Sequence, residues 1–199
     1  MFTTCYIQIK QFILSYFARY FLLLCCLLLV TSCTNQRIIA LKLPLAGNAY
    51  YLLQPIPASL NNRGLQATFT ISHQNKEQEL LVQAEFNQSR MVVSGMTLEG
   101  LTLFTISWQD SSNIIDFESK IDIEPLRMLA EMQFSLWPIA DVANGLKNAL
   151  IKELSGNTKE ISVNDVILYQ LSQDNNLTHI INNQQHYQLI INELARWKI

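Results

Sequence analysis

The sequence Pro125-Leu-Arg-Met-Leu-Ala-Glu-Met-Gln-Phe-Ser-Leu-Trp-Pro138 divides two series of short alternating segments and has a different period from both. Its apolar residues recur at helical spacing, and Pro125 suits the first turn of a helix. Pro138 ends this helix and can begin another, because a proline disfavours the helical conformation of the residue before it. The apolar spacing resumes at Ile139 and continues until Ser155-Gly-Asn157. The sequence therefore predicts two consecutive helices between residues 125 and 154.

Apolar and polar residues alternate on both sides of these helices. Ala67, Phe69 and Ile71, for example, have threonine or serine as their following neighbours. Turn-forming pairs such as Asn164-Asp165 separate the alternating runs, as in hairpins. The predicted strands are 67–72, 80–86, 90–94, 101–108 and 114–123 before the helices, and 160–163, 166–171, 177–182 and 186–194 after them. This alternation is typical of an antiparallel sheet with one apolar face.

A sheet with one apolar face needs a cover, and the two predicted helices can supply it. Met128, Met132 and Phe134 lie off the main apolar stripe of the first helix, which is therefore apolar nearly all round. Such a helix is usually buried. The sequence thus predicts an α+β fold whose interior is either a packed core or an apolar cavity.

The N-terminal segment has the features of a secretory signal. Phe21-Leu-Leu-Leu-Cys-Cys-Leu-Leu-Leu-Val-Thr-Ser-Cys33 is an apolar run that ends in small residues and follows the cations Lys10 and Arg19. Residues 30–33 resemble the bacterial lipobox, which implies cleavage before Cys33, a diacylglycerol on its thiol and an acyl chain such as palmitate on its amine. Thr34 in place of an acid implies, in that class of lipoproteins, the periplasmic face of the outer membrane.

An uncleaved signal anchor is the alternative to this lipoprotein signal. The apolar run 20–30 is shorter than the roughly 20 residues that a membrane span needs. Extending the run back to residue 12 would place Arg19 within the span, at a cost of roughly 2.5 kcal/mol. The lipoprotein signal is therefore the preferred interpretation.

Composition excludes several classes of protein. All four cysteines lie within the first 33 residues, so the rest of the chain has no disulfide or cysteine-rich metal framework. The leader holds two cations and no acid, so its removal leaves 12 basic and 16 acidic residues and a formal charge of −4. This charge argues against a nucleic-acid partner. We predict a signal peptide at 1–32, a lipidated tether at 33–49 and a single domain at 50–199.

Two stretches resemble an uncharacterised family of small proteobacterial lipoproteins. They are Gln133-Phe-Ser-Leu-Trp-Pro138, where Phe134 replaces the leucine of a Gln-Leu-x-x-Trp-Pro pattern, and Leu53-Gln-Pro-Ile-Pro-Ala-Ser-Leu60. That family in turn resembles the lipoprotein localisation factors LolA and LolB, and its members often accompany genes for aryl-polyene lipid pigments. The resemblance implies a strongly curved antiparallel half-barrel of about 9–11 strands, with the two central helices as a lid over a cavity for acyl chains.

This resemblance leads to specific expectations about function. The protein would be a monomeric, non-enzymatic lipoprotein without cofactor or metal, which binds an acyl or polyenyl lipid or lipoprotein chain and passes it to the outer membrane. Other periplasmic lipid-export proteins are potential partners. In LolB-like proteins a loop presents an apolar residue to the membrane, which implies this role for Met96 and Leu98; the alternative is a hairpin whose leucine packs into the rim. The candidate lining residues are Phe69, Phe104, Trp108, Phe117, Leu129, Phe134 and Trp137.

Two other readings remain open. One is a structural or assembly lipoprotein with a filled core that docks a partner protein, and the other is an enzyme acting on lipids. Evidence for the enzyme is thin, because His73, His179 and His186 have no metal-ligand spacing and no nucleophile or phosphate-binding motif occurs. Arg127 and Glu131, four residues apart on the first helix, are expected to pair.

Overall fold

A computed structural model describes residues 36–39, for which only the backbone is considered, and residues 42–199. The predicted signal peptide and the predicted lipidation site, Cys33, lie outside the described residues. The folded unit runs from Gln36 to Ile199, so it includes residues that the sequence places in a tether. Within the described part, neither helix has the length and apolar character needed to cross a membrane.

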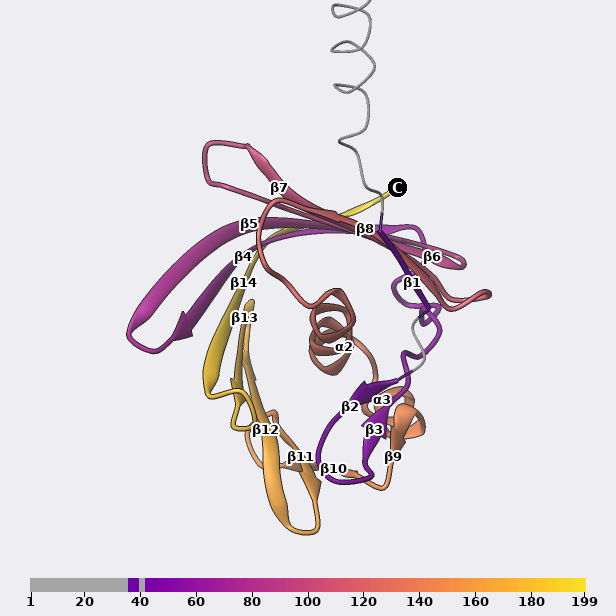
Figure 1. The fold of residues 1–199 in the computed structure, drawn as a ribbon, viewed down its shortest axis with the longest axis vertical. Coiled ribbons are helices and arrows are strands. Elements are labelled where there is room, and N and C mark those ends of the chain that lie inside the picture. Colours follow the sequence, from indigo (N-terminus) through magenta and orange to yellow (C-terminus); the bar gives the residue numbers. More distant parts are fainter. Residues whose placement is uncertain (1–35, 40–41) are drawn as a thin grey trace, which may run out of the picture. The chain divides into compact units, whose positions relative to one another are not determined.

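An antiparallel sheet of eleven strands forms most of the fold (Figure 1). From one edge to the other its strands are β1 (Gln36–Ile39), β8 (Ile114–Ser119), β7 (Thr102–Gln109), β6 (Arg90–Met96), β5 (Lys76–Asn87), β4 (Arg63–His73), β14 (Tyr187–Lys198), β13 (Leu177–Asn182), β12 (Val166–Asp174), β11 (Thr158–Val163) and β10 (Leu150–Leu154). The pairing of β4 with β14 joins the strands that precede the helices to those that follow them.

The remaining elements are two helices and a small sheet. The helices are α2 (Pro125–Leu136) and α3 (Ile139–Gly145), and the small sheet contains β2 (Leu43–Pro44), β3 (Tyr50–Tyr51) and β9 (Leu146–Lys147). Figure 1 shows the large sheet bending around α2, with β2, β3 and α3 on the side of α2 that the sheet leaves open. The centre of the fold is therefore a helix with strands on several sides.

The predicted α+β class and the half-barrel with a two-helix lid are wrong. Strands account for 56% of the structure and helices for 12%, and the sheet stays open. The second helix was expected to reach residue 154, but it ends at Gly145 and the chain continues as β9 and β10. The first helix is packed inside the bend of the sheet, with Leu129 and Phe134 fully buried, and does not lie over the sheet as a lid.

Gly145 gives the physical reason for the early end of α3. A Cβ atom at this position would lie 2.4 Å from the Tyr51 ring and 2.5 Å from the Leu52 carbonyl oxygen. The Leu52 amide donates a hydrogen bond of 3.0 Å to the Gly145 carbonyl, and the next residue, Leu146, pairs with Tyr51 as a strand. Pairing with a distant segment therefore overrides the helical periodicity of the local sequence.

Asparagines and glycines set the turns and the bend of the sheet. The turn pairs Gln74-Asn75 and Asn164-Asp165 have positive φ at both residues, as the tight hairpin turns require. Gly64 pairs with Trp197 and Gly95 pairs with Phe104, and each aromatic ring occupies the space of the missing Cβ. Glycines covered by cross-strand rings allow a sheet to curve sharply.

Candidate functional site

An apolar pocket of about 220 Å³ lies between the first half of α2 and the facing parts of β4 and β14. It is larger than an engineered cavity of about 150 Å³ that binds benzene. The pocket therefore has room for a short apolar segment, although it opens to solvent and does not enclose a long chain. Its lining consists of Phe69, Ile71, Asp122, Ile123, Glu124, Arg127, Met128, Glu131, Tyr187 and Leu189.

Strand register and helix position bring this lining together. Ile71 on β4 lies opposite Leu189 on β14, and Phe69 lies opposite Ile191, so apolar side chains of both strands share one face. Met128 faces them from α2. Because residues two apart along a strand point to the same side, the alternation seen in the sequence produces this apolar wall directly.

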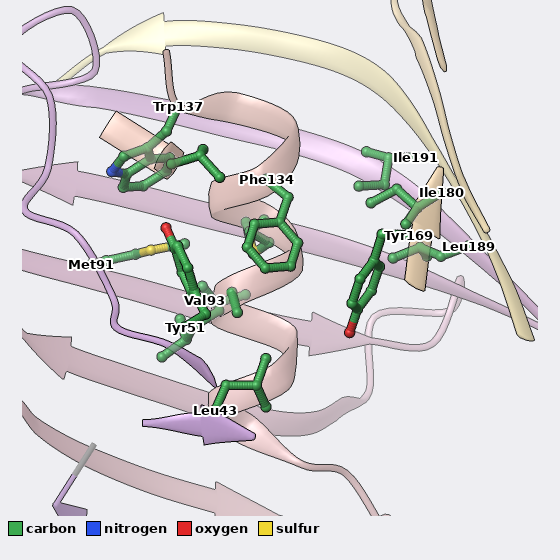
Figure 2. Packing of buried hydrophobic residues seen from close by; sticks show 14 of the residues in the cluster. Leu43, Tyr51, Met91, Val93, Phe134, Trp137, Tyr169, Ile180, Leu189 and Ile191 are labelled. Carbon is green, nitrogen blue, oxygen red and sulfur yellow. The ribbon is translucent and has the colours of Figure 1, made fainter. Parts of the chain in front are cut away.

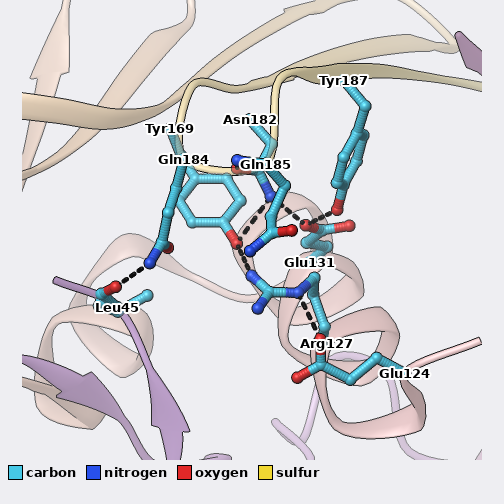
Figure 3. A network of polar contacts seen from close by, with 9 residues as sticks. All are labelled: Leu45, Glu124, Arg127, Glu131, Tyr169, Asn182, Gln184, Gln185 and Tyr187. Carbon is cyan, nitrogen blue, oxygen red and sulfur yellow. Dashed lines mark hydrogen bonds and ion pairs between the residues drawn. The ribbon is translucent and has the colours of Figure 1, made fainter. Parts of the chain in front are cut away.

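A network of polar side chains (Figure 3) adjoins the pocket and contributes Glu124, Arg127, Glu131 and Tyr187 to its polar wall. Glu131, with only 4% of its surface exposed, accepts hydrogen bonds from the Tyr187 hydroxyl and from Asn182 Nδ2, the latter at 3.1 Å. Asn182 Nδ2 also donates to the Tyr169 hydroxyl at 3.1 Å. The same hydroxyl accepts from Arg127 Nη1 at 3.1 Å. The network therefore joins α2 to β12, β13 and β14.

Arg127 and Glu131 do not meet the expectation that they pair with each other. Arg127 Nε donates to Glu124 Oε2 at 2.8 Å, one turn earlier, while its other contact goes to Tyr169. Desolvation disfavours the charged guanidinium, yet Tyr169 and Glu124 hold the pKa of Arg127 above its ordinary value. The side chain is therefore a cation whose partners are already supplied by the protein.

Burial raises the pKa of the carboxyl group and of the two tyrosines in the network. Desolvation raises the pKa of Glu131, although hydrogen bonds from Tyr187 and Asn182 act in the opposite direction. Desolvation together with Glu131 raises the pKa of Tyr187 and of Tyr169. Both hydroxyls therefore stay protonated and act as donors or acceptors, not as bases.

The seven predicted lining residues have different positions. Phe69 lines the pocket, and none of the other six does. Phe104 covers Gly95, and Phe117 is partly buried against the core. Figure 2 shows Phe134 between Tyr51 and Tyr169, with ring centroids 4.7 and 5.3 Å apart. The remaining three, Trp108, Leu129 and Trp137, are buried in the same core.

The two stretches that carried the family resemblance contact each other. Gln133 Oε1 accepts hydrogen bonds from the Tyr51 hydroxyl at 2.7 Å and from the Gln54 amide at 2.8 Å. Gln133 Nε2 donates to the Gln54 carbonyl at 2.9 Å, and Trp137 Nε1 donates to the Pro55 carbonyl at 2.8 Å. Residues four apart share a helix face, so this spacing fastens the proline-containing segment to α2.

The predicted membrane-contact residues lie at and beside the turn between β6 and β7. Met96 is half-buried at the end of β6, whereas Leu98 is 58% exposed and the following Leu101 is 59% exposed. Two backbone hydrogen bonds hold the turn, from the Thr97 amide to the Leu101 carbonyl at 3.0 Å and from the Gly100 amide to the Thr97 carbonyl at 2.9 Å. Leu98 is therefore presented to solvent and is not packed into a rim.

Sequence reasoning did not find Tyr169, Asn182 and Tyr187, because they come from three strands far from α2 in the chain. The available signal was Glu131 itself, an acid on a helix that is otherwise apolar nearly all round. Among the side chains of residues 42–199, no group of histidine, cysteine, aspartate or glutamate could hold a metal ion.

Comparison with known proteins assigns the chain to a family. No curated protein matches it. One family model covers residues 64–195, from the first residues of β4 to those near the end of β14, and so includes the complete pocket and its polar wall. The resemblance to LolA and LolB stays a prediction. The chain belongs to DUF3261, a family of proteins of unknown function.

Proposed function

We propose that the protein is an outer-membrane lipoprotein, anchored on the periplasmic face through Cys33, that binds an acyl or polyenyl lipid tail and passes it to the membrane. The apolar pocket between α2 and strands β4 and β14 is the observation that carries this proposal. Binding and release of the tail would involve apolar burial, with no covalent step.

The size of the pocket favours a transient complex. Each buried methylene contributes about 0.8 kcal/mol, and a pocket of about 220 Å³ takes only a short part of a chain. If roughly five methylenes are buried, the gain is about 4 kcal/mol before the cost of association. A ligand held this weakly exchanges readily, as transfer to a membrane requires.

The turn between β6 and β7 would also suit transfer. It exposes Leu98 and Leu101, which could enter the membrane to which the Cys33 lipid would hold the protein.

Photo-crosslinking in membranes with a diazirine-bearing fatty alcohol tests the proposal, because it captures a ligand that exchanges readily. Met128→Trp should fill the pocket and abolish labelling of residues 121–131 and 187–189, whereas Val166→Trp, which adds the same side chain at an exposed position, should leave it unchanged. Absence of this labelling from the wild type, or equal labelling of both variants, would contradict the proposal.

A structural role is the second candidate, and the free edge of the large sheet favours it. Strand β10 ends the sheet and exposes Leu150 at 62% and Leu154 at 43%, and unpaired strand edges can take up a strand of another chain. A photoreactive residue at Leu150 that cross-links a partner protein in cells, with no labelling of the apolar pocket by the lipid probe, would support this role over lipid binding.

A further inference from the structure

A second pocket, of about 380 Å³, lies at the end of the large sheet that carries the β4–β5 and β13–β14 turns. It falls within the range of roughly 300–1,000 Å³ that is typical of small-molecule sites. Its lining residues are Ser72, His73, Gln74, Asn75, Ile181, Asn182, Asn183, His186, Tyr187 and Gln188. This polar pocket and the apolar pocket share Tyr187.

The shared tyrosine makes the two pockets neighbours. Tyr187 is the first residue of β14 and lies opposite His73 on β4 and opposite Asn182 on β13. Its hydroxyl contacts Glu131 in the wall of the apolar pocket. Ser72, Ile181 and Gln188 of the polar pocket lie one residue along their strands from the row that contains Ile71 and Leu189, and therefore on the opposite face of the sheet. A molecule with an apolar part and a polar part would occupy both pockets by passing Tyr187 around the ends of these strands.

The lining of the polar pocket contains no carboxylate, ammonium or guanidinium group. None of its ten residues is an aspartate, glutamate, lysine or arginine. Its side chains are mainly amides, hydroxyls and imidazoles, and all of these can both donate and accept hydrogen bonds. Sugar and polyol hydroxyls have the same double capacity, whereas phosphates and carboxylates only accept and are usually held by arginine or lysine.

Charges around the apolar pocket further disfavour an acidic ligand. Three acids line it, Asp122, Glu124 and Glu131. The cation in its lining is Arg127, whose guanidinium is already bonded to Glu124 and Tyr169. An anionic head placed here would face carboxylates without a free cation to balance them.

We propose that the ligand is an amphiphile with an uncharged, hydroxyl-rich head such as a sugar, which places its head in the polar pocket and its tail in the apolar pocket. The inference rests on the proposed function, since it assigns a head-group class to the lipid whose tail the apolar pocket would hold.

Photo-crosslinking of the full chain in lipid nanodiscs tests this inference. The probes are diazirine-bearing octyl glucoside, octyl phosphate, octanoate and octanol, whose alkyl chains have seven or eight carbons and whose heads differ. Peptide mapping reports labelling at residues 121–131 and 187–189. One or two additional hydrogen bonds should make labelling by the glucoside about fivefold stronger than by the phosphate or the octanoate.

A pair of alanine variants and a competitor complete the test. His73→Ala should lower labelling by octyl glucoside and leave labelling by octanol unchanged, whereas Asn87→Ala, at an exposed position at the other end of β5, should alter neither. Unlabelled octyl glucoside should compete, and free glucose should not. Equal or stronger labelling by the acidic probes, or competition by glucose alone, would overturn the inference. Failure of every probe to label the pocket would instead overturn the proposed function.

Discussion

Replacing Gln133 by leucine should destabilise the fold strongly, although the two side chains are similar in size. The Gln133 amide makes three hydrogen bonds, to the Tyr51 hydroxyl and to the amide and carbonyl of Gln54. Leucine can form none of these hydrogen bonds, so all three partner groups lose theirs to this side chain. The change therefore tests whether the glutamine fastens segment 50–57 to α2.

The expected loss can be worked out from the burial of the three partners. Tyr51 is fully buried, so its unpaired hydroxyl costs about 1–3 kcal/mol. The Gln54 backbone is half-buried, and water can replace part of what its two groups lose, at about 0.5–1 kcal/mol each. Leucine fills the space and adds no cavity term. The free energy of unfolding should therefore fall by about 2–5 kcal/mol, a large share of a typical total of about 5–15 kcal/mol.

Urea unfolding of the chain without residues 1–33, followed by tryptophan fluorescence, measures this loss. Gln78→Leu, the same change at an exposed position, should stay within about 0.5 kcal/mol of wild type. In a Tyr51→Phe background, Gln133→Leu should cost about 1 kcal/mol less, because one partner is already gone. A loss below about 1 kcal/mol for Gln133→Leu, or no coupling to Tyr51, would refute the reasoning.

Four further changes have defined outcomes. Burial raises the pKa of Glu131 above its ordinary 4.5, so the protonated carboxyl stabilises the fold fully below pH 4.5 and this stabilisation is lost as the pH rises through the raised pKa. Urea titrations at several pH values should show this decline in the free energy of unfolding for the wild type and not for Glu131→Gln. Gly95→Ala places a methyl group 2.1 Å from the Phe104 ring and should lower stability by about 1–3 kcal/mol, seen as a lower urea midpoint. Leu98→Asp should weaken vesicle flotation without changing the melting temperature, since Leu98 is exposed, and unchanged flotation would argue against membrane contact. Cys33→Ser should move the protein out of the membrane fraction or leave the leader uncut, and an unaltered fraction and migration would exclude the lipobox.

Local chemistry made the strands predictable. Alternation placed β4, β5, β7, β12 and β13 close to their observed positions, and Asn164-Asp165 marked a hairpin turn that the structure contains. Both signals depend on neighbours in the chain, namely side-chain alternation along a strand and tolerance of positive φ. The order of most strands, and their pairing with neighbours in the chain, can therefore be predicted from the sequence.

Contacts between distant segments explain what the sequence did not reveal. Gly145 ends α3 because Tyr51 and Leu52 approach it, and no local pattern reports that approach. Glu131 meets partners 51 and 56 residues further along the chain, so spacing rules cannot assemble its network. Of the seven predicted lining residues, Phe69 lines the apolar pocket and the other six do not, for a related reason. Alternation separates inward from outward side chains but does not distinguish a filled interior from a pocket.

The pairing of β4 with β14 has a consequence for how the chain matures. A ribosome or translocon delivers β4 early and β14 last, so β4 waits with one edge unpaired until the C-terminus arrives. Contacts this remote in sequence form slowly. During that interval the unpaired edge of β4 can pair with another nascent chain. Chaperones that bind the unfinished chain would therefore determine the yield of native protein. Deletion of β14 should thus abolish maturation, where loss of the outermost strand β10 would be tolerated far better.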